Sequence, residues 1–337
     1  MSPGITVKME KIGNANAERV LFTIFIITLG LEQSPINLPQ PKLAIQSKVS
    51  PYFKYEDTPF KVEEGNQNFK EGDILKIRYD NGALRISAPT FGKVVTLDGG
   101  IYQAQEIIFN TPSNHRIDDK KYDMEMQIVH KGVSKGDLAK YLILCFLFKK
   151  KAGATNKFLE KLELFSLPNP LESYRDLSSN VFIPNIMLQE QDDDLDTMVP
   201  FSFFSYQGSL QEPPCSENTI VYVASEPIPT SVFSLQLMKE ALNYPDTVDS
   251  SGRKQGSEPI MNNREIQRQH GRSIFYYDSG MCDLMSKKVV DAVENGHYEK
   301  VVKPFKKYFF VEGQKPSGLP GSWVVTEKEA KGLILTP

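Results

Sequence analysis

The chain has 337 residues, of which 40% are hydrophobic and 24% charged, and its formal net charge is −3. This composition is ordinary for a globular protein, and the length allows one large domain or two smaller ones. Because there is no excess of positive charge, we expect no nucleic-acid partner.

The usage of cysteine and histidine argues against a standard metal centre. The chain has three cysteines and no Cys-x-x-Cys pair, which predicts neither a cysteine zinc site nor a full disulfide framework. Its histidines lie neither four apart, as in a helical metal pair, nor two apart, as on one face of a strand. They are His115, His130, His270 and His297.

Residues 1–29 contain an uncharged run, Val20 to Leu29. The run is too short to span a bilayer, which needs about 20 apolar residues. Lys8, Lys11 and Arg19 precede it, as in the core of a signal peptide, but no small-residue cleavage motif follows it. We therefore expect an uncleaved, buried segment, and whether it associates with a membrane stays open.

The middle of the chain is rich in β-strand patterns. Ile74 to Ile86 alternates apolar residues around Asp80-Asn81-Gly82, which predicts a hairpin. Short runs with β character follow at 107–110 and 124–130, and Thr219 to Ala224 (TIVYVA) is a strongly β-prone run. Residues 92–100 have three glycines without the Lys-Ser/Thr pair of a phosphate loop, so we expect a strand that ends in a turn.

Helical patterns occur at 231–242 and 283–293, and turn-forming residues predict loops at 167–196 and 244–259. Beyond about residue 275 the chain becomes rich in lysine, glycine and proline. We therefore divide it into an N-terminal segment (1–29), a main domain (30–275) and a C-terminal extension (276–337).

Four sequence blocks occur in the order found in one known family. They are Gln33-Ser34-Pro35-Ile36-Asn37-Leu38, Phe109 to His130 (FNTPSNHRIDDKKYDMEMQIVH), Tyr206 to Asn218 (YQGSLQEPPCSEN) and Asn263 to Gln267 (NREIQ). Together they resemble the α-class carbonic anhydrases. The resemblance implies a mainly β fold, one large, twisted, mostly antiparallel sheet with short peripheral helices.

The same resemblance implies zinc-hydroxide chemistry, with the metal held by three histidines from two adjacent strands. In this sequence the three ligand positions correspond to Ile108, Asn110 and Gln127. Isoleucine has no donor atom, and the neutral amide oxygens of Asn and Gln bind zinc poorly. We therefore expect no metal and no cofactor.

Other catalytic positions of the family are also altered. Gln211 and Glu212 stand where the resemblance places two threonines, Asn114 replaces a glutamate, and Ala83 replaces the proton-shuttle histidine. We expect no catalytic residues and no carbonic anhydrase activity, as in a pseudoenzyme. The retained positions are Glu125, His115, His130, Tyr206, Leu210, Arg264 and Gln267.

The substituted residues suggest how the metal pit is filled. We expect Asn110, Gln127, Gln211 and Asn114 to form a hydrogen-bonded network with Glu125, because unpaired buried polar groups cost about 1–3 kcal/mol each. Ile108 would fill volume, while Gln211 and Glu212 would narrow the mouth of the pit.

Two further departures concern location. The cysteine that would pair with Cys215 in secreted relatives is replaced by the stretch Ile27-Thr28-Leu29, so we expect no such disulfide. An intracellular location is therefore favoured over a secreted one.

Pro213-Pro214 suggests a cis peptide bond, as the resemblance implies.

Three function classes remain after this reasoning. We favour a structural subunit that binds other proteins in a larger assembly. The alternative is a receptor or adhesin that binds glycan or protein at the narrowed mouth of the pit or at a basic stretch. That stretch is Lys149-Lys150-Lys151 with Lys157 and Lys161, which we otherwise expect to be a solvated loop. An enzyme with residual hydrolytic activity is the third class, although no nucleophile has an adjacent base. We expect the lysines and aromatics at 298–310 to form an amphipathic element that docks on a partner or on its own domain. We expect the acidic run Asp192 to Asp194 to be a solvated loop.

Overall fold

A computed structural model describes residues 30–55, 76–80, 83–87, 92–97, 99–133, 139–162, 164, 175–176, 201–247, 261–285 and 287–295. The apolar run 20–29, the acidic run 192–194 and the lysine-aromatic stretch 298–310 lie outside these residues, as does most of the predicted loop 167–196.

The described chain is mostly β-strand, with a few short helices. The strands are β1 (Asn37–Leu38), β2 (Ile45–Ser47), β3 (Val49–Ser50), β4 (Tyr52–Tyr55), β5 (Lys76–Asp80), β6 (Ala83–Ser87), β7 (Gly92–Val95), β8 (Ile101–Asn110), β9 (Arg116–Ile117), β10 (Lys120–Lys121), β11 (Met124–Gly132), β12 (Tyr141–Lys150), β13 (Arg175–Asp176), β14 (Phe203–Gly208), β15 (Thr219–Ala224), β16 (Ile228–Thr230), β17 (Phe275–Tyr277) and β18 (Asp283–Leu284). The helices are η1 (Pro41–Leu43), α2 (Lys157–Lys161), α4 (Val232–Thr247) and α5 (Lys287–Glu294).

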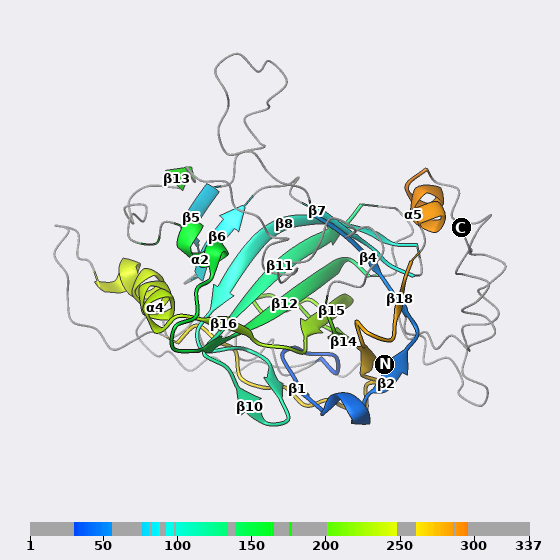
Figure 1. Cartoon of the computed structure of the whole chain (residues 1–337), viewed down its shortest axis with the longest axis horizontal. Coiled ribbons are helices and arrows are strands. Elements are labelled where there is room, and N and C mark those ends of the chain that lie inside the picture. Colours follow the sequence, from blue (N-terminus) through cyan, green and yellow to red (C-terminus); the bar gives the residue numbers. More distant parts are fainter. Residues whose placement is uncertain are drawn as a thin grey trace, which may run out of the picture.

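One large twisted sheet forms the centre of the molecule (Figure 1). Its main path runs β13-β5-β6-β8-β11-β12-β15-β14-β17-β2, and most neighbouring strands are antiparallel. Parallel pairing occurs between β12 and β15, between β12 and β16, and between β17 and β2. The predicted mainly β fold with one large, mostly antiparallel sheet is confirmed.

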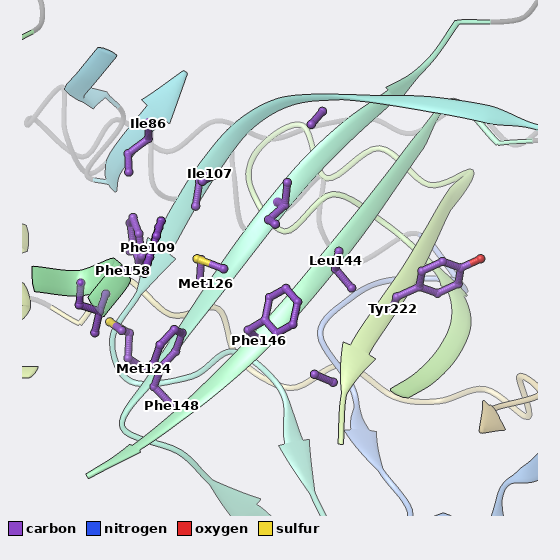
Figure 2. Close-up of a cluster of buried hydrophobic side chains, with 14 of the residues drawn as sticks. Ile86, Ile107, Phe109, Met124, Met126, Leu144, Phe146, Phe148, Phe158 and Tyr222 are labelled. Atoms are coloured by element: carbon purple, nitrogen blue, oxygen red, sulfur yellow. The ribbon is translucent and has the colours of Figure 1, made fainter. Parts of the chain in front are cut away.

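The two faces of the sheet bury different side chains, because successive residues of a strand point to opposite sides. One face carries the main apolar core, in which Phe109, Met126 and Phe146 pack together (Figure 2). Helix α2 adds Phe158 to this core, and α4 adds Leu235 and Met238. On the opposite face, β8 and β11 place the residues that the sequence analysis singled out.

Several predicted elements lie where the sequence placed them. The expected hairpin is β5 and β6, which pair antiparallel with Asp80 opposite Ala83. The run 219–224 is strand β15, and residues 92–95 form β7, followed by a turn with Gly99 at φ 86°. Helix α4 spans 232–247, which confirms the helix predicted at 231–242 but shows that the loop predicted at 244–259 was wrong for its first residues, and residues 248–259 lie outside the described part of the chain.

Two predictions need correction. The predicted helix 283–293 is shorter, because residues 283–284 form β18, which pairs with β3, and the helix α5 begins at Lys287. The basic stretch predicted as a loop is in part regular structure, since Lys149 and Lys150 end strand β12 and Lys157–Lys161 is helix α2.

The segment after residue 275 is partly built into the fold. The boundary set at 275/276 falls inside β17, which pairs with β14 and β2 in the main sheet. Beyond it, Met285, Val289, Val290 and Val293 pack on Val49 and Val95, and the Lys93 ammonium lies 2.7 Å from the Glu294 carboxylate. No helix in the described part of the chain is long and apolar enough to cross a bilayer.

Candidate functional site: a polar pit on the sheet

Strand register brings the three expected ligand positions together. Gln127 on β11 is paired with Ile108 on β8. Two residues further along the same antiparallel strands, Glu125 is paired with Asn110. Because alternate residues share a face, all four lie on the side of the sheet opposite the main core. Each of the four is buried.

Gln127 is held between two acceptors. Its Nε2 donates to Glu125 Oε1 at 2.9 Å and to Gln211 Oε1 at 2.9 Å. The side chain therefore directs its N–H groups, and not a lone pair, at these two neighbours. The expected network of Gln127, Gln211 and Glu125 is present.

Asn110 and Asn114 do not join that network. Asn110 Nδ2 donates to the carbonyl oxygen of Asn262 at 3.1 Å. Asn114 Oδ1 accepts a hydrogen bond of 2.6 Å from the backbone N–H of Arg264. The expectation for these two residues was wrong, because the segment at 262–264 crosses the end of β8 and offers backbone partners, a proximity that has no local sequence signal.

Apolar side chains fill the opposite part of the pit. Ile108, Ala83 and Val129 form a buried cluster, with the partly buried Leu210 against it. Ala83 thus lies beside Ile108, as β6 pairs with β8. The cluster leaves a small polar edge formed by amides next to an aliphatic wall.

A charged group closes the pit toward solvent. Arg85 on β6 is opposite Ile108 in the register, and its guanidinium pairs with Glu212 and, at 3.0 Å, with Glu106. Burial alone would lower the pKa of Arg85, but the two carboxylates outweigh it and raise the pKa. The side chain of Glu212 is 31% exposed, so this ion pair forms the boundary with solvent.

Sequence reasoning identified Glu212 but missed the other two members of this charged group, Arg85 and Glu106. A signal was present in the alternation of the strands. Arg85 lies two residues from Ala83 and Glu106 two residues from Ile108, and such spacing places charges on the pit face.

Behind the pit lies a second polar group, centred on Glu125. The Glu125 carboxylate accepts from the backbone N–H of His115 at 2.7 Å and from its ring Nδ1 at 2.9 Å. The other ring nitrogen of His115 lies 2.7 Å from the hydroxyl of Tyr206, which donates to Ser34 Oγ at 2.9 Å. Burial alone would raise the pKa of Glu125, but His115 and the hydrogen bonds from His115 and Gln127 lower it, so the group stays ionised.

Cys145 completes this second group and was not singled out from the sequence. It pairs with Gln127 across β11 and β12, and burial, with the nearby Glu125, raises the pKa of its thiol. Among the described residues, His115, Glu125 and Cys145 have ligand atoms within 4.8 Å of one another. Both nitrogens of His115 are already engaged by Glu125 and Tyr206, so we interpret the group as a hydrogen-bonded support.

Other retained positions hold the chain segments that frame the pit. Arg264 donates to the carbonyl oxygen of Ser34 and to Gln33 Oε1. Pro213-Pro214 is cis, as expected, and all three cysteines are free thiols, so Cys215 forms no disulfide. His130 is buried away from the pit network, and its ring lies 2.7 Å from the hydroxyl of Tyr55.

Comparison with known proteins identifies the family. A model of the eukaryotic-type carbonic anhydrases matches residues 25–278. The chain belongs to this family. Alpha carbonic anhydrase 8 of Arabidopsis thaliana is 27% identical over 225 residues, which cover 67% of this chain and 50% of that relative, so the chain spans half its length.

Two further relatives agree with the fold. Dioscorin DB3S of Dioscorea polystachya is 24% identical, and the match covers 74% of this chain and 77% of the dioscorin. The solved structure of the Photobacterium profundum α-carbonic anhydrase superposes with a TM-score of 0.56 at 19% identity, covering 80% of this chain and all of that one. The resemblance seen in the sequence is confirmed at the level of family and fold.

The residues in the pit do not fit the zinc ion that the family implies. Of the three expected ligand positions, Ile108 offers no donor atom and Gln127 offers N–H groups. Asn110 Oδ1 is the one oxygen left, and a single neutral amide oxygen does not hold zinc, which prefers nitrogen and sulfur ligands.

Proposed function

We propose that this member of the carbonic anhydrase family is not a catalyst and serves as a structural subunit that binds other proteins. The observation that carries the proposal is the position of Gln127 Nε2, which donates to both Glu125 and Gln211. A hydrogen-bond donor at this point repels a cation, and Ile108 opposite supplies no replacement ligand.

The activity part of the proposal is tested by metal content and by carbon dioxide hydration on one purified sample with zinc added. We expect less than stoichiometric zinc and no hydration above buffer. The matched control is the triple variant Ile108→His, Asn110→His and Gln127→His, which should take up zinc because it restores three imidazoles at strand spacing. One zinc per wild-type chain together with hydration activity would overturn the proposal.

The structural part draws support from exposed apolar side chains beside a strand edge. Strand β2 is the last strand on the described path of the sheet, and Ile45 on it is 39% exposed, with Leu43 nearby at 71%. Edge strands with exposed apolar residues are sites where another chain adds. We propose other proteins of an intracellular assembly as the partners.

Cross-linking mass spectrometry on the native source tests this role. Cross-links from lysines 42 and 48, which flank β2, to one recurrent partner chain are expected. A native mass equal to the single chain, with cross-links only within it, would contradict the assembly role.

One observation favours a second candidate, a receptor for an anionic glycan or protein. Lys149, Lys150 and Lys151 are consecutive and all exposed. Retention on heparin that weakens steeply with salt, and is lost when these three lysines are changed to glutamine, would favour this reading.

A further inference from the structure

Three consecutive lysines stand at the end of strand β12, and all three are exposed. Lys149 and Lys150 are the last two residues of the strand, and Lys151 follows them. Because successive residues of a strand point to opposite faces, Lys149 lies on the face of Leu147 and Lys150 on the face of Phe148, and these two residues belong to different buried clusters. The lysines therefore surround the end of the strand and do not line one face of the sheet.

Two exposed apolar side chains lie beside these lysines. Strand β16 pairs with this end of β12, with Thr230 opposite Lys150, and the carbonyl oxygen of Thr230 accepts from the backbone N–H of Lys151 at 2.9 Å. Helix α4 begins two residues later with Val232 and Phe233, which are 60% and 70% exposed (Figure 1). Phenylalanine is most often buried, and neighbouring apolar side chains that are exposed and rimmed by charge are typical of an interaction surface.

The hairpin on the other side of β12 adds two more lysines. The backbone N–H of Asp123 donates to the carbonyl oxygen of Phe148 at 3.0 Å, and the backbone N–H of Lys150 donates to Asp123 Oδ2 at 2.9 Å. Strand β10, which ends two residues before Asp123, consists of Lys120 and Lys121, and both are exposed. The end of β12 thus has lysines on one side and apolar side chains on the other.

This end of the sheet carries an excess of positive charge. Among the described residues, Asp123 and Glu226 are the carboxylates next to the five lysines in the chain segments that meet here, and Glu226 precedes β16. Asp118 and Asp119 occupy the turn of the hairpin, where they accept hydrogen bonds from side-chain amides beside β1. The first turn of α4 adds partial positive charge, because its backbone N–H groups have no acceptor within the helix.

We propose that this end of the sheet binds the surface of an anionic lipid bilayer. Val232 and Phe233 enter the interfacial layer of the bilayer, and the lysines contact the lipid phosphates. A flat surface reaches lysines on both faces of the strand end, whereas a peptide in a groove reaches one face only. A soluble polyanion would use the lysines but would leave the two apolar side chains in water.

The proposal concerns a different surface from the one in the proposed function. Strand β2, the edge proposed there for partner proteins, lies at the end of the sheet path, whereas β12 lies inside it. A chain that is recovered with a partner protein but does not bind vesicles would overturn only the present inference.

The test is vesicle flotation of the full chain. One set of vesicles contains equal parts of phosphatidylserine and phosphatidylcholine, and the other contains phosphatidylcholine alone. We expect saturable binding to the mixed vesicles that weakens as salt rises, and binding at least about tenfold weaker to phosphatidylcholine alone. Absence of binding at low salt, or equal binding to both sets, would overturn the proposal.

The lysines of β12 are tested by changing them together, as Lys149→Gln, Lys150→Gln and Lys151→Gln. Binding should weaken about 100-fold, since each lysine near an anionic surface contributes about fivefold. The matched control changes three other exposed lysines to glutamine, at positions 54, 131 and 140. Equal losses in the two triple variants would show a general effect of net charge and reject the site.

The apolar pair separates a bilayer from a soluble polyanion. Val232→Ser combined with Phe233→Ser should weaken vesicle binding about tenfold or more, because it removes the side chains that enter the bilayer. The control, Val133→Ser combined with Met281→Ser, changes two side chains that are 59% and 75% exposed and should leave binding unchanged. Vesicle binding that needs the lysines but not the apolar pair would reject the bilayer and favour an anionic glycan, which retention on heparin would then show.

Vesicle binding that survives in both patch variants would place the contact elsewhere on the chain and overturn the proposal. Circular dichroism of each variant checks its folding. The dependence of wild-type binding on lipid charge and salt decides against the proposal even if a variant does not fold.

Discussion

The candidate site has two halves, the polar group centred on Glu125 behind the pit and the pit itself, and they differ in how completely their polar atoms are hydrogen-bonded. Behind the pit, His115, Glu125 and Tyr206 form a closed set in which the described hydrogen bonds join group to group. Within the pit, the positions that the sequence resemblance assigns to the zinc ligands carry an aliphatic side chain and two amides, and Asn110 and Gln211 each leave one atom unpaired among the described residues. The difference teaches which parts of an active site depend on one another.

The physical reason lies in how the groups are linked. A buried carboxylate needs its partners, because an uncompensated buried charge costs several kcal/mol, so Glu125 and His115 must be kept or lost together. The three metal ligands of the family are linked only through the metal. Once the metal is absent, each ligand position can change independently to any residue that packs.

The largest expected effect comes from breaking the closed set. Glu125→Gln keeps the size of the side chain but removes its negative charge, and it replaces one of the two oxygens that accept hydrogen bonds from His115 and Gln127 with an NH₂ donor. We expect the free energy of unfolding to fall by about 3–5 kcal/mol, measured by urea denaturation. Glu226→Gln, at an exposed position, should change it by less than about 0.5 kcal/mol. A Glu125→Gln variant as stable as the wild type would mean that the two halves do not differ.

Shortening the side chain of Ile108 tests whether the apolar cluster in the pit is tightly packed. Ile108→Ala should lower the free energy of unfolding by about 3 kcal/mol, because Ile108 is buried against Ala83 and Val129. The control Val133→Ala changes a side chain that is 59% exposed and should have little effect. A small loss at Ile108 would show a loosely packed pit.

The pH dependence of the free energy of unfolding provides a further test at His130, a retained residue that belongs to neither half. Burial lowers the pKa of His130 to about 4, with hydrogen bonds from the ring to backbone opposing the shift. Because the unfolded chain binds this proton near pH 6.5, stability is full above that pH and falls as the pH drops toward 4. We expect a loss of about 2 kcal/mol between pH 6.5 and 4.5, before protonation of Glu125 contributes.

Denaturant titrations at each pH measure this loss. In His130→Gln the curve should be flatter over the same interval, whereas His270→Asn, at an exposed position, should follow the wild type. If His130→Gln keeps the full slope, the acid sensitivity belongs to other groups.

The smallest effect is expected for a pair of matched glutamine changes. Gln33 donates to the carbonyl oxygen of Cys215 and to Glu217, and accepts from Arg264, so Gln33→Met should cost about 1–3 kcal/mol. Gln211→Met removes one hydrogen bond but also one unpaired donor, and should cost less than about 1 kcal/mol. Thermal unfolding of both variants measures the difference, and equal losses would mean that the unpaired donor of Gln211 carries no cost.

The fold and much of the pit could be predicted from the sequence because strand patterns are local. The hairpin of β5 and β6, strand β15 and the shared face of Ile108, Asn110 and Gln127 all follow from alternation along strands. The contact of Asn110 with Asn262 could not be predicted, because 152 residues separate them and the bond uses the backbone of Asn262. The Arg85–Glu212 pair was missed for a similar reason, since 127 residues separate the two, although the alternation along β6 placed Arg85 on the same face as Ala83.

Helix α5 has a practical consequence for anyone producing this protein. The family match ends at residue 278, but Val289, Val290 and Val293 lie beyond it and cover Val49 and Val95. A fragment cut at the family boundary would expose this valine surface to water and favour self-association. The smallest fragment that remains monodisperse after limited proteolysis should therefore extend at least to Asn295.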